Sequence, residues 1–493
     1  IEGRTWNIDQ KYARHLGQHS LKLGGNYSYH CCQRNNPEGT DIQFSSIADM
    51  IANAPSRVAP TFGNGAYRAR LYQIGFFAQD DWRIRKNLVL NIGIRYDFFS
   101  NLTANALKTA PESAFYNPDG ILSFQTFAIG PIRPLGSPYE HDKGINLGPR
   151  FGFSYNPDGR GKMVLRGGYG IMFSDQVAGA MWQSTQYTLA TPFRRTLSRA
   201  EAAQFGIKWP SYNDDIRKVL VAEQKRTGRV DVFSVFNPKL QNPYSQHFSF
   251  GIQRELTSTL ALETGFVGVR GVKFIMHRWA NNVDRLTGLR PNPLLGVNYY
   301  VDHSQQLFYS SWQTSLRKRM SRNLTGSINY TWGKSLSTGG GDTGAYYQGD
   351  NDSRTQEFND IRADRGPSTG DITHYFVGEY LYELPRFTGI GNAVARHILG
   401  GWQTSGILTA TTGQPIIIGQ SSTINASRPD YIGGQAVLPD YKQTLQYLNP
   451  AAFARVPINA VSGATVRPGN IGNGAIRAPG AWTLDFSLAK NFT

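Results

Sequence analysis

Hydrophobic and polar residues alternate along residues 71–99, LYQIGFFAQDDWRIRKNLVLNIGIRYDFF. From Leu88 onward the even positions are apolar and the odd positions are mostly polar, a period of two that is typical of a β-strand. The same alternation precedes a polar turn at residues 83–87. The pattern predicts two strands joined by a short turn, with one apolar and one polar face.

Period-two counting predicts further strands of similar length along the chain. We expect them at residues 4–13, 20–30, 71–82, 88–99, 147–156, 163–173, 244–254, 260–270, 308–319, 324–333, 372–384, 400–412 and 482–492. A tilted strand needs about 9–11 residues to cross a bilayer, whereas strands of soluble proteins are commonly about 5–6 residues long. The lengths therefore favour a membrane-spanning sheet.

Short and long connections alternate between these predicted strands. The short ones are residues 15–18, 83–87, 157–162, 255–259 and 320–323, with 385–399 intermediate; the long ones are 31–70, 100–146, 174–243, 271–307, 333–371 and 413–481. This alternation places every long loop at the same end of the sheet. Short periplasmic turns and long extracellular loops are the pattern of outer-membrane barrels. The sequence predicts an all-β fold, a transmembrane antiparallel up-and-down β-barrel.

The alternation also assigns side chains to the two faces of the wall. The lipid-facing candidates are Leu90, Ile92, Ile94, Phe153 and Ile328, and the lumen-facing candidates are Asn91, Arg95, Asp97, Arg150 and Arg166. An Arg on the lipid face at mid-membrane costs about 2–4 kcal/mol, so the assignment cannot easily be reversed. Aromatic residues at strand ends, such as Trp82 and Trp402, fit the girdles found at membrane interfaces.

Composition agrees with a turn-rich β protein, with 53 Gly, 25 Pro and 12% aromatic residues. Charged residues make up 17%, below the usual level of about 25%. The mean hydropathy is −0.39 and no run of about 18 apolar residues occurs, which excludes a helical membrane protein. A barrel is not excluded, because its strands are apolar only at alternate positions.

The formal net charge of +16 raises the question of nucleic-acid binding. Lys and Arg are spread over the whole chain without a compact basic module, so we expect a solvated surface and no nucleic-acid partner. The only cysteines are the adjacent Cys31 and Cys32, which exclude a disulfide framework and a four-ligand zinc site. Both a vicinal bridge and two free thiols remain open.

Both termini suggest a partial barrel domain spanning residues 1–493. The chain starts without a Met, a basic segment or an apolar segment of a signal peptide, and its last alternating run, from residue 482, has no partner after it. Ile1-Glu2-Gly3-Arg4 matches a protease-recognition tetrapeptide of expression vectors. It can equally be native, because strand-like alternation begins at once.

The loop at residues 174–243 carries two helix signals. Ser198 followed by Glu201 matches a capping box, and Asp214 and Asp215 precede an apolar run that ends before Gly228. We predict two short helices there.

Catalytic and metal-binding motifs are weak. The richest carboxylate cluster comprises Asp342, Asp350, Asp352, Glu357, Asp360, Asp364 and Asp371. Asp350-Asn351-Asp352 lacks the Gly and terminal Glu of an EF-hand, so we expect a solvated loop and no metal site. Gly167-Gly168-Tyr169-Gly170 lies inside a predicted strand, where small residues would let lumen contents approach the wall. With no HExxH or GxSxG motif, we predict no catalytic residue and no cofactor.

Several segments together resemble a known family. They are FFAQDDWRIRKNLVLNIGIRYD from residue 76, NLGPRFGFSYNPDGRGKMVLRGGYGIMF from 146, NPYSQHFSFGIQREL from 242, ALETGFVGVRG from 261, SLRKRMSRNLTGSINYTWGKS from 315, ADRGPSTGDITHYFVGEYLYELP from 363, LGGWQTSGI from 399 and LDFSLAKNF from 484. In this order they are similar to the barrel of Oar-like TonB-dependent receptors.

This resemblance implies a barrel of about 22 strands in the outer membrane of a Gram-negative bacterium, filled by an N-terminal plug. An N-terminal TonB box would contact the TonB–ExbB–ExbD complex, and long extracellular loops would capture an unknown ligand. The chain departs from the family in that it contains no recognisable plug, TonB box or closing strands with a terminal aromatic residue. The family has no catalytic residues to transfer, so we expect a non-enzyme.

The sequence is therefore compatible with three functions. The leading hypothesis is a TonB-dependent transporter or receptor that contacts outer-membrane lipid. The second is a structural or adhesive outer-membrane barrel without energised transport, and the third is a secreted soluble β-rich protein that binds glycans or acts as an enzyme. A plug in the full gene separates the first two, and recovery in a soluble fraction would identify the third.

Overall fold

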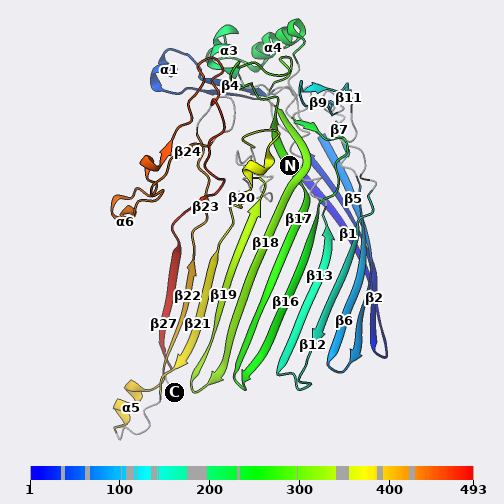
Figure 1. Cartoon of the computed structure of the whole chain (residues 1–493), viewed down its shortest axis with the longest axis vertical. Helices are drawn as coiled ribbons and strands as arrows, with labels where there is room; N and C mark the ends of the chain where they lie inside the picture. Colours follow the sequence, from blue (N-terminus) through cyan, green and yellow to red (C-terminus); the bar gives the residue numbers. More distant parts are fainter. Residues whose placement is uncertain are drawn as a thin grey trace.

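The computed structural model describes residues 2–491 apart from 35–38, 62–66, 101–102, 107–115, 119, 135–141, 143, 175–196, 230–233, 297, 340–354, 386–391 and 421–427. Within these residues the chain forms one large, curved antiparallel sheet with the long loops gathered at one end (Figure 1).

The main sheet follows the order of the sequence, so each strand pairs with the strands before and after it. The strands, in order, are β1 (Glu2–Leu16), β2 (His19–Arg34), β5 (Tyr67–Arg85), β6 (Leu88–Phe99), β12 (Leu147–Tyr155), β13 (Met163–Phe173), β16 (Tyr244–Thr257), β17 (Leu260–Ala280), β18 (Asn298–Ser321), β19 (Leu324–Ser337), β21 (His374–Glu383), β22 (Trp402–Thr411) and β27 (Ala481–Lys490). They confirm the predicted strands and the up-and-down order. In the described part of the chain, β1 and β27 are the two edges of this sheet.

Several strands are longer than predicted. The predicted loop at residues 271–307 consists largely of strand, because β17 continues to Ala280 and β18 begins at Asn298. The pairing of these two strands shifts register between Gly271 and Phe274, where Lys273 has a φ of +60°. Such a bulge interrupts the period of two. The period-two alternation in the sequence therefore stops near residue 271, although the β17–β18 hairpin continues beyond it.

The short turns lie at one end of the sheet, which we call the turn end. The β18–β19 turn consists of Arg322 and Asn323, whose φ angles are +51° and +64°. Two central residues with positive φ match the twist of a tight hairpin. The connection from β21 to β22 is longer and contains α5 (Ala393–Leu399). No helix among the described residues is both long and apolar enough to cross a membrane.

The sheet has two chemically different faces. Register places Ile92 opposite Phe151 and Leu90 opposite Phe153, so these side chains share one face. Large apolar side chains remain exposed on that apolar face across the sheet: Phe76, Ile92, Ile94, Phe151, Phe250, Trp312, Ile328, Trp332 and Phe486. The other side is the polar face and carries the intervening residues.

At the opposite end, the loop end, two long loops fold together into a small cap. The cap contains β3 (Gly39–Gln43), α1 (Ile47–Ile51), β4 (Arg57–Thr61), β14 (Leu197–Ser198), α3 (Arg199–Gln204) and α4 (Asn213–Thr227). Its buried core is formed by Val58, Leu197, Ala202, Ile207, Ile216 and Leu220. Arg199 donates to both carboxylate oxygens of Asp49 at 2.8 and 2.7 Å and so joins the two loops.

The cap confirms the two helices predicted from sequence. Ser198 and Glu201 form a complete capping box at the start of α3. Gly228, with a φ of +69°, ends α4 in the left-handed conformation.

Other short elements complete the loop end. They are β7 (Thr103–Ala106), β8 (Tyr116–Pro118), β9 (Ile121–Ser123), β10 (Ala128–Ile129), β11 (Ile132–Pro134), β15 (Ser234–Phe236), η4 (Ile361–Asp364), β20 (Gly366–Pro367), β23 (Pro415–Ile416), β24 (Asp430–Tyr431), α6 (Tyr441–Thr444), η5 (Pro450–Ala452), β25 (Phe453–Ala454) and β26 (Ile476–Arg477).

Arg285 joins three loops above β17–β27. Its guanidinium donates to Glu357 Oε1 at 2.8 Å, to the Gln356 carbonyl at 3.1 Å and to the Thr465 carbonyl at 3.0 Å. The side chain is 12% exposed. A planar guanidinium that donates to several acceptors holds their relative positions. We call the segments around residues 281–296, 355–373, 412–420 and 428–480 the loop platform.

We predict that Arg285→Ala loosens the loop platform. The variant leaves two carbonyls and one carboxylate without their donor, which costs about 1–3 kcal/mol. Trypsin cleavage after Arg455, followed by mass spectrometry, should accelerate about tenfold or more. Lys218→Ala in α4, which removes only an exposed ion pair with Asp215, is the control and should not change this rate. Equal rates in both variants would contradict the role of Arg285.

A second prediction concerns the pH dependence of the Arg467–Asp430 ion pair in the loop platform. Both nitrogens of the Arg467 fork bind the Asp430 carboxylate at 2.8 and 2.6 Å, and the Asn470 N–H donates at 3.0 Å. Arg467 holds the pKa of the Asp430 carboxyl below its usual value. Because the folded-state pKa is the lower one, the pair stabilises the platform above a pH of about 4, and this contribution is lost as the pH falls through the lowered pKa.

The measurement compares pepsin cleavage of the platform in the wild type and in Asp430→Asn. The variant should be cleaved faster at pH 5, and the difference should shrink as the pH falls well below about 4. A difference that stays constant over this range would show that the charge of Asp430 does not stabilise the platform.

Candidate functional site

The polar face near β2, β5 and β6 holds two hydrogen-bonded clusters. Toward the turn end, Asp81 accepts hydrogen bonds from Lys22 Nζ and Asn91 Nδ2, both at 2.6 Å. Toward the loop end, Arg95 binds Asp97 at 2.7 Å. The charges on this face are thus compensated by partners on neighbouring strands.

The second cluster is nearly closed to solvent. Arg95 also donates to Asn26 Oδ1 at 2.7 Å, and Asp97 is only 5% exposed. Asn146 donates to the Asp97 carbonyl at 3.0 Å. The structure therefore brings three of the five predicted lumen-facing residues, Asn91, Arg95 and Asp97, into two neighbouring clusters.

The remaining two residues lie farther along the same face. Arg150 is exposed and stands opposite Gly93 in the register of β12 and β6. Arg166 stands opposite Ser154 and lines a cavity of about 1250 Å³ at the turn end. These residues share a face and do not form a single site.

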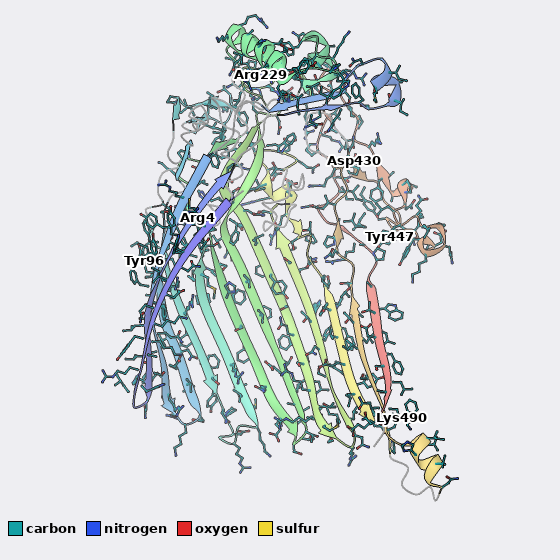
Figure 2. All side chains as sticks on the ribbon, turned by 180° about the vertical axis from the view of Figure 1, so that it is seen from behind. Arg4, Tyr96, Arg229, Asp430, Tyr447 and Lys490 are labelled. Atoms are coloured by element: carbon teal, nitrogen blue, oxygen red, sulfur yellow. The ribbon has the colours of Figure 1, made fainter. Side chains whose placement is uncertain are left out.

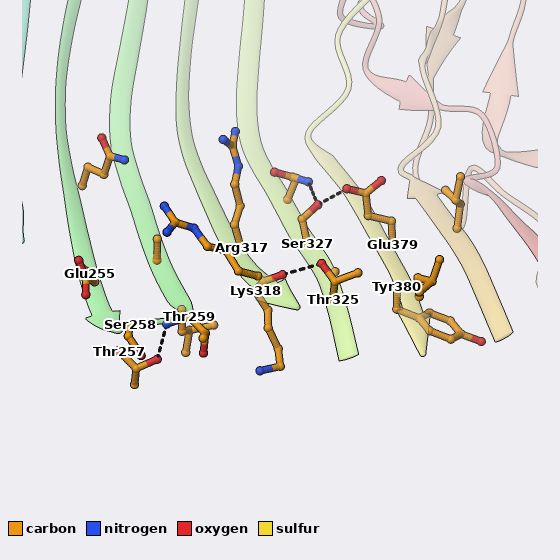
Figure 3. A pocket seen from close by; sticks show the side chains of 18 of the residues that line it. Glu255, Thr257, Ser258, Thr259, Arg317, Lys318, Thr325, Ser327, Glu379 and Tyr380 are labelled. Atoms are coloured by element: carbon orange, nitrogen blue, oxygen red, sulfur yellow. Dashed lines mark hydrogen bonds between the residues drawn. The ribbon is translucent and has the colours of Figure 1, made fainter. Parts of the chain in front are cut away.

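The cavity extends along the polar face from β13 to β27 (Figure 3). A chain of hydrogen bonds crosses its wall: Ser315 donates to Asn329 at 2.8 Å, Asn329 donates to Ser327 at 3.0 Å, and Ser327 donates to Glu379 at 2.8 Å. These contacts link β18, β19 and β21 through their side chains. The alternation of the strands is what places all four groups on one side.

Charges of both signs line the cavity. Arg166 and Arg317 provide positive charge, while Glu379 and Asp485 provide negative charge. Such a wall can hold a polar solute or a polar protein segment through many hydrogen bonds. The described residues contain no group of three or more His, Cys, Asp or Glu side chains that could hold a metal ion.

Sequence analysis missed a hydrogen-bonded polar pair on the apolar face. Asp80 stands opposite Ile92 and binds His19 Nδ1 at 2.6 Å. The His19 ring stacks on Trp82 with a centroid distance of 5.4 Å. Asp80 has the parity of Ile74 and the other apolar positions of β5, so the signal was present in the alternation. Its position close to the turn end allows a polar pair at the rim of the apolar face.

The predicted solvated carboxylate loop is wrong for its buried members. Asp364 is 2% exposed and accepts hydrogen bonds from Arg428 Nη1 at 2.6 Å and the Gln356 N–H at 3.1 Å. Burial raises the pKa of Asp364, and the Arg428 guanidinium opposes this shift. Asp371 is 1% exposed and binds Arg477 and Lys334. These carboxylates hold loops together through ion pairs that the sequence pattern does not reveal.

Three further predictions can be compared with the structure. Asp342, Asp350 and Asp352 lie outside the described residues. A Cβ on Gly167 would lie 2.4 Å from the Phe153 ring, so this glycine makes room for an aromatic side chain on the apolar face, contrary to its expected role facing the lumen. Cys31 is a free thiol in the structure.

Comparisons with known proteins found a matching family model and several similar solved structures. The family model described as "Outer membrane beta barrel domain" matches residues 2–493. No curated protein matches the chain. Solved structures similar to the chain include the outer membrane transporter YddB from Escherichia coli, with 11% identity, 89% of this chain and 45% of that protein covered, and a TM-score of 0.49.

Two further similar structures are receptors. For the siderophore receptor PirA from Acinetobacter baumannii the identity is 9%, the coverage 100% of this chain and 56% of that protein, and the TM-score 0.43. For the ferripyoverdine receptor of Pseudomonas aeruginosa the identity is 11%, the coverage 87% of this chain and 40% of that protein, and the TM-score 0.40. The chain spans about half the length of these solved proteins.

The family match covers almost every residue, and the strands that it covers form an antiparallel sheet with one apolar and one polar face. The chain therefore belongs to the outer membrane beta barrel domain family and is a transmembrane β-barrel protein of the bacterial outer membrane.

Proposed function

We propose that this chain is part of the barrel of a TonB-dependent transporter or receptor of the Oar-like type. The observation that carries the proposal is the cavity of about 1250 Å³ on the polar face. The other face of the same strands carries exposed apolar side chains. In an outer membrane the apolar face contacts lipid and the polar face lines a passage. The proposed role is non-enzymatic.

The proposal gives each predicted residue a role. Ile92, Ile94 and Ile328, which are 45–49% exposed in the structure, face acyl chains together with Leu90 and Phe153. Asn91, Arg95, Asp97, Arg150 and Arg166 face the lumen. The cap and the loop platform lie on the extracellular side, since long loops are extracellular in such barrels. They would capture the ligand before it enters the lumen.

Gating in this proposal is provided by a plug outside residues 1–493. A folded plug surface carries polar groups of both signs, which complement the mixed charges of Arg166, Arg317, Glu379 and Asp485. A TonB box preceding the plug would receive energy from TonB, ExbB and ExbD. The complete barrel would contain about 22 strands, including the thirteen that form the continuous path from β1 to β27 in this sheet.

The proposed facing predicts different tolerance at two positions on opposite faces of β6. Ile94→Arg, opposite Ala78 and farther from the turn end than the Asp80–His19 pair, places a guanidinium against lipid at a cost of about 2–4 kcal/mol and should block assembly. Asn91→Arg places the same group beside Asp81 on the polar face and should be tolerated. A heat-modifiability gel of outer-membrane fractions from cells that express the complete protein measures assembly. Equal assembly of both variants would overturn the facing.

Energised gating predicts an energy-dependent change at the cavity. In the complete protein with Cys31 and Cys32 replaced by serine, Ser327→Cys should react with a polar maleimide at rates that differ at least severalfold between cells with and without ExbB. Ile328→Cys, one residue away on the apolar face, is the matched control and should react equally in both. If Ser327→Cys also reacts equally, the non-energised structural or adhesive barrel becomes the better interpretation.

A further inference from the structure

The short helix α5 carries an exposed apolar surface at the turn end of the sheet. Val394, Ile398 and Leu399 are 67%, 57% and 46% exposed. Asn392 Oδ1 accepts hydrogen bonds from the N–H groups of Val394 and Ala395 at 2.9 and 3.2 Å, which caps the first turn. In Figure 1, α5 lies beyond the lower ends of β21, β22 and β27.

The last turn of α5 is attached to two strands by side chains. Trp402 Nε1 donates to the Ile398 carbonyl at 2.9 Å. Lys490 Nζ donates to the carbonyls of His397, Ile398 and Gly400 at 2.5, 2.8 and 3.0 Å. A cation at the carboxyl end of a helix satisfies its free carbonyls and complements its dipole. Figure 2 shows Lys490 at the lower end of the edge strand, beside the helix.

Both attaching side chains belong to the apolar face. Trp402 and Lys490 are direct partners in the register of β22 and β27, and Lys490 Nζ lies 5.1 Å from the centre of the Trp402 ring. Two residues farther along β27 toward the loop end, Leu488 shares their face and is 54% exposed. The contacts therefore fix the end of α5 on the lipid side of the wall and away from the cavity on the polar face.

The height of this attachment matches a membrane interface. Because a strand rises about 3.3–3.4 Å per residue, the end of α5 lies within about 7 Å of the exposed apolar side chains of β27 along the strand. Trp and Lys are the residue types that combine an apolar body with a polar tip at the boundary between headgroups and acyl chains. The apolar surface of α5 thus continues the lipid-contacting face of the barrel.

We propose that α5 is an interfacial lipid-binding helix that rests in the headgroup region of the periplasmic leaflet of the outer membrane. Val394, Ile398 and Leu399 contact the acyl chains of phospholipids, while Trp402 and Lys490 act as positioning residues that hold the helix against the wall. An interfacial helix of this kind buries its apolar side in the headgroup–acyl boundary. The helix thereby ties the β21–β22 connection to the membrane, independently of any transport activity.

The experiment measures the environment of a nitroxide label on α5. The complete protein, with its native cysteines replaced by serine, is labelled at Ile398→Cys and reconstituted in phosphatidylethanolamine–phosphatidylglycerol vesicles. At each site we measure the ratio of the label's collision rate with oxygen to its collision rate with a water-soluble nickel chelate. We expect this ratio at Ile398→Cys to be severalfold higher than at Leu445→Cys. Leu445 is 90% exposed in the loop platform and serves as the aqueous control. Phe486→Cys, at the barrel wall, is the lipid control.

Two results would overturn the proposal. A ratio at Ile398 equal to that at Leu445 would place α5 in water. Protection from both reagents would show that another protein segment covers the helix. The variants Trp402→Phe and Lys490→Gln test the positioning residues: each should lower the oxygen preference at Ile398 by at least twofold and leave Phe486 unchanged. An unchanged ratio at Ile398 in both would show that they do not hold the helix at the interface.

Discussion

The structure depends on one constraint: each strand of the wall must pair its backbone with its neighbours while separating its side chains between two environments. In the hydrocarbon of a bilayer, an unpaired N–H or C=O group has no water to bind, so strands are stable there only in a continuous ladder. The ladder runs from β1 to β27 in the order of the sequence. Because pairing fixes register, Ile92 and Phe151 must share a face, and Asn91 must face the other way.

The cavity follows from the same constraint. Ser327, Asn329 and Glu379 come from two strands, yet alternation and register bring their side chains together on one side. No loop or helix is needed to build this polar wall. Elsewhere on the polar face, charges are compensated locally, as in the Lys22–Asp81 and Arg95–Asp97 pairs of β2, β5 and β6, which lowers the cost of placing them on a partly buried surface.

The loop end is stabilised by different interactions. The cap has a small hydrophobic core, around Val58 and Leu220, that neither contributing loop could form alone. The loop platform is held by Arg285 and by the buried Arg428–Asp364 pair. Ion pairs shielded from water are specific in geometry, and removing one partner leaves the other uncompensated. Loops far apart in sequence therefore act as two folded units above the wall.

The turn end combines features of both regions. Asp80 and Lys490 are charged residues that have the parity of apolar positions. They occur close to strand ends, where water and headgroups are within reach of a polar tip. Asp80 binds His19, whose ring stacks on Trp82, and Lys490 Nζ lies over the Trp402 ring. These rings and charges mark the boundary at which the apolar face ends and at which α5 is attached.

Local patterns in the sequence were sufficient to predict the wall. Period-two alternation at positions such as Ile92, Ile328 and Phe486 predicted the strands and their two faces, because a strand's side-chain period is local and needs no knowledge of its partners. The alternation of short and long connections predicted the up-and-down order of the strands. The Ser198–Glu201 capping box likewise predicted α3 from neighbouring residues alone. The remaining contacts form only when distant segments of the chain come together. The burial of Asp364, the triple contact of Arg285 and the attachment of α5 through Lys490 join residues 64 to 180 positions apart, and no local pattern encodes such contacts.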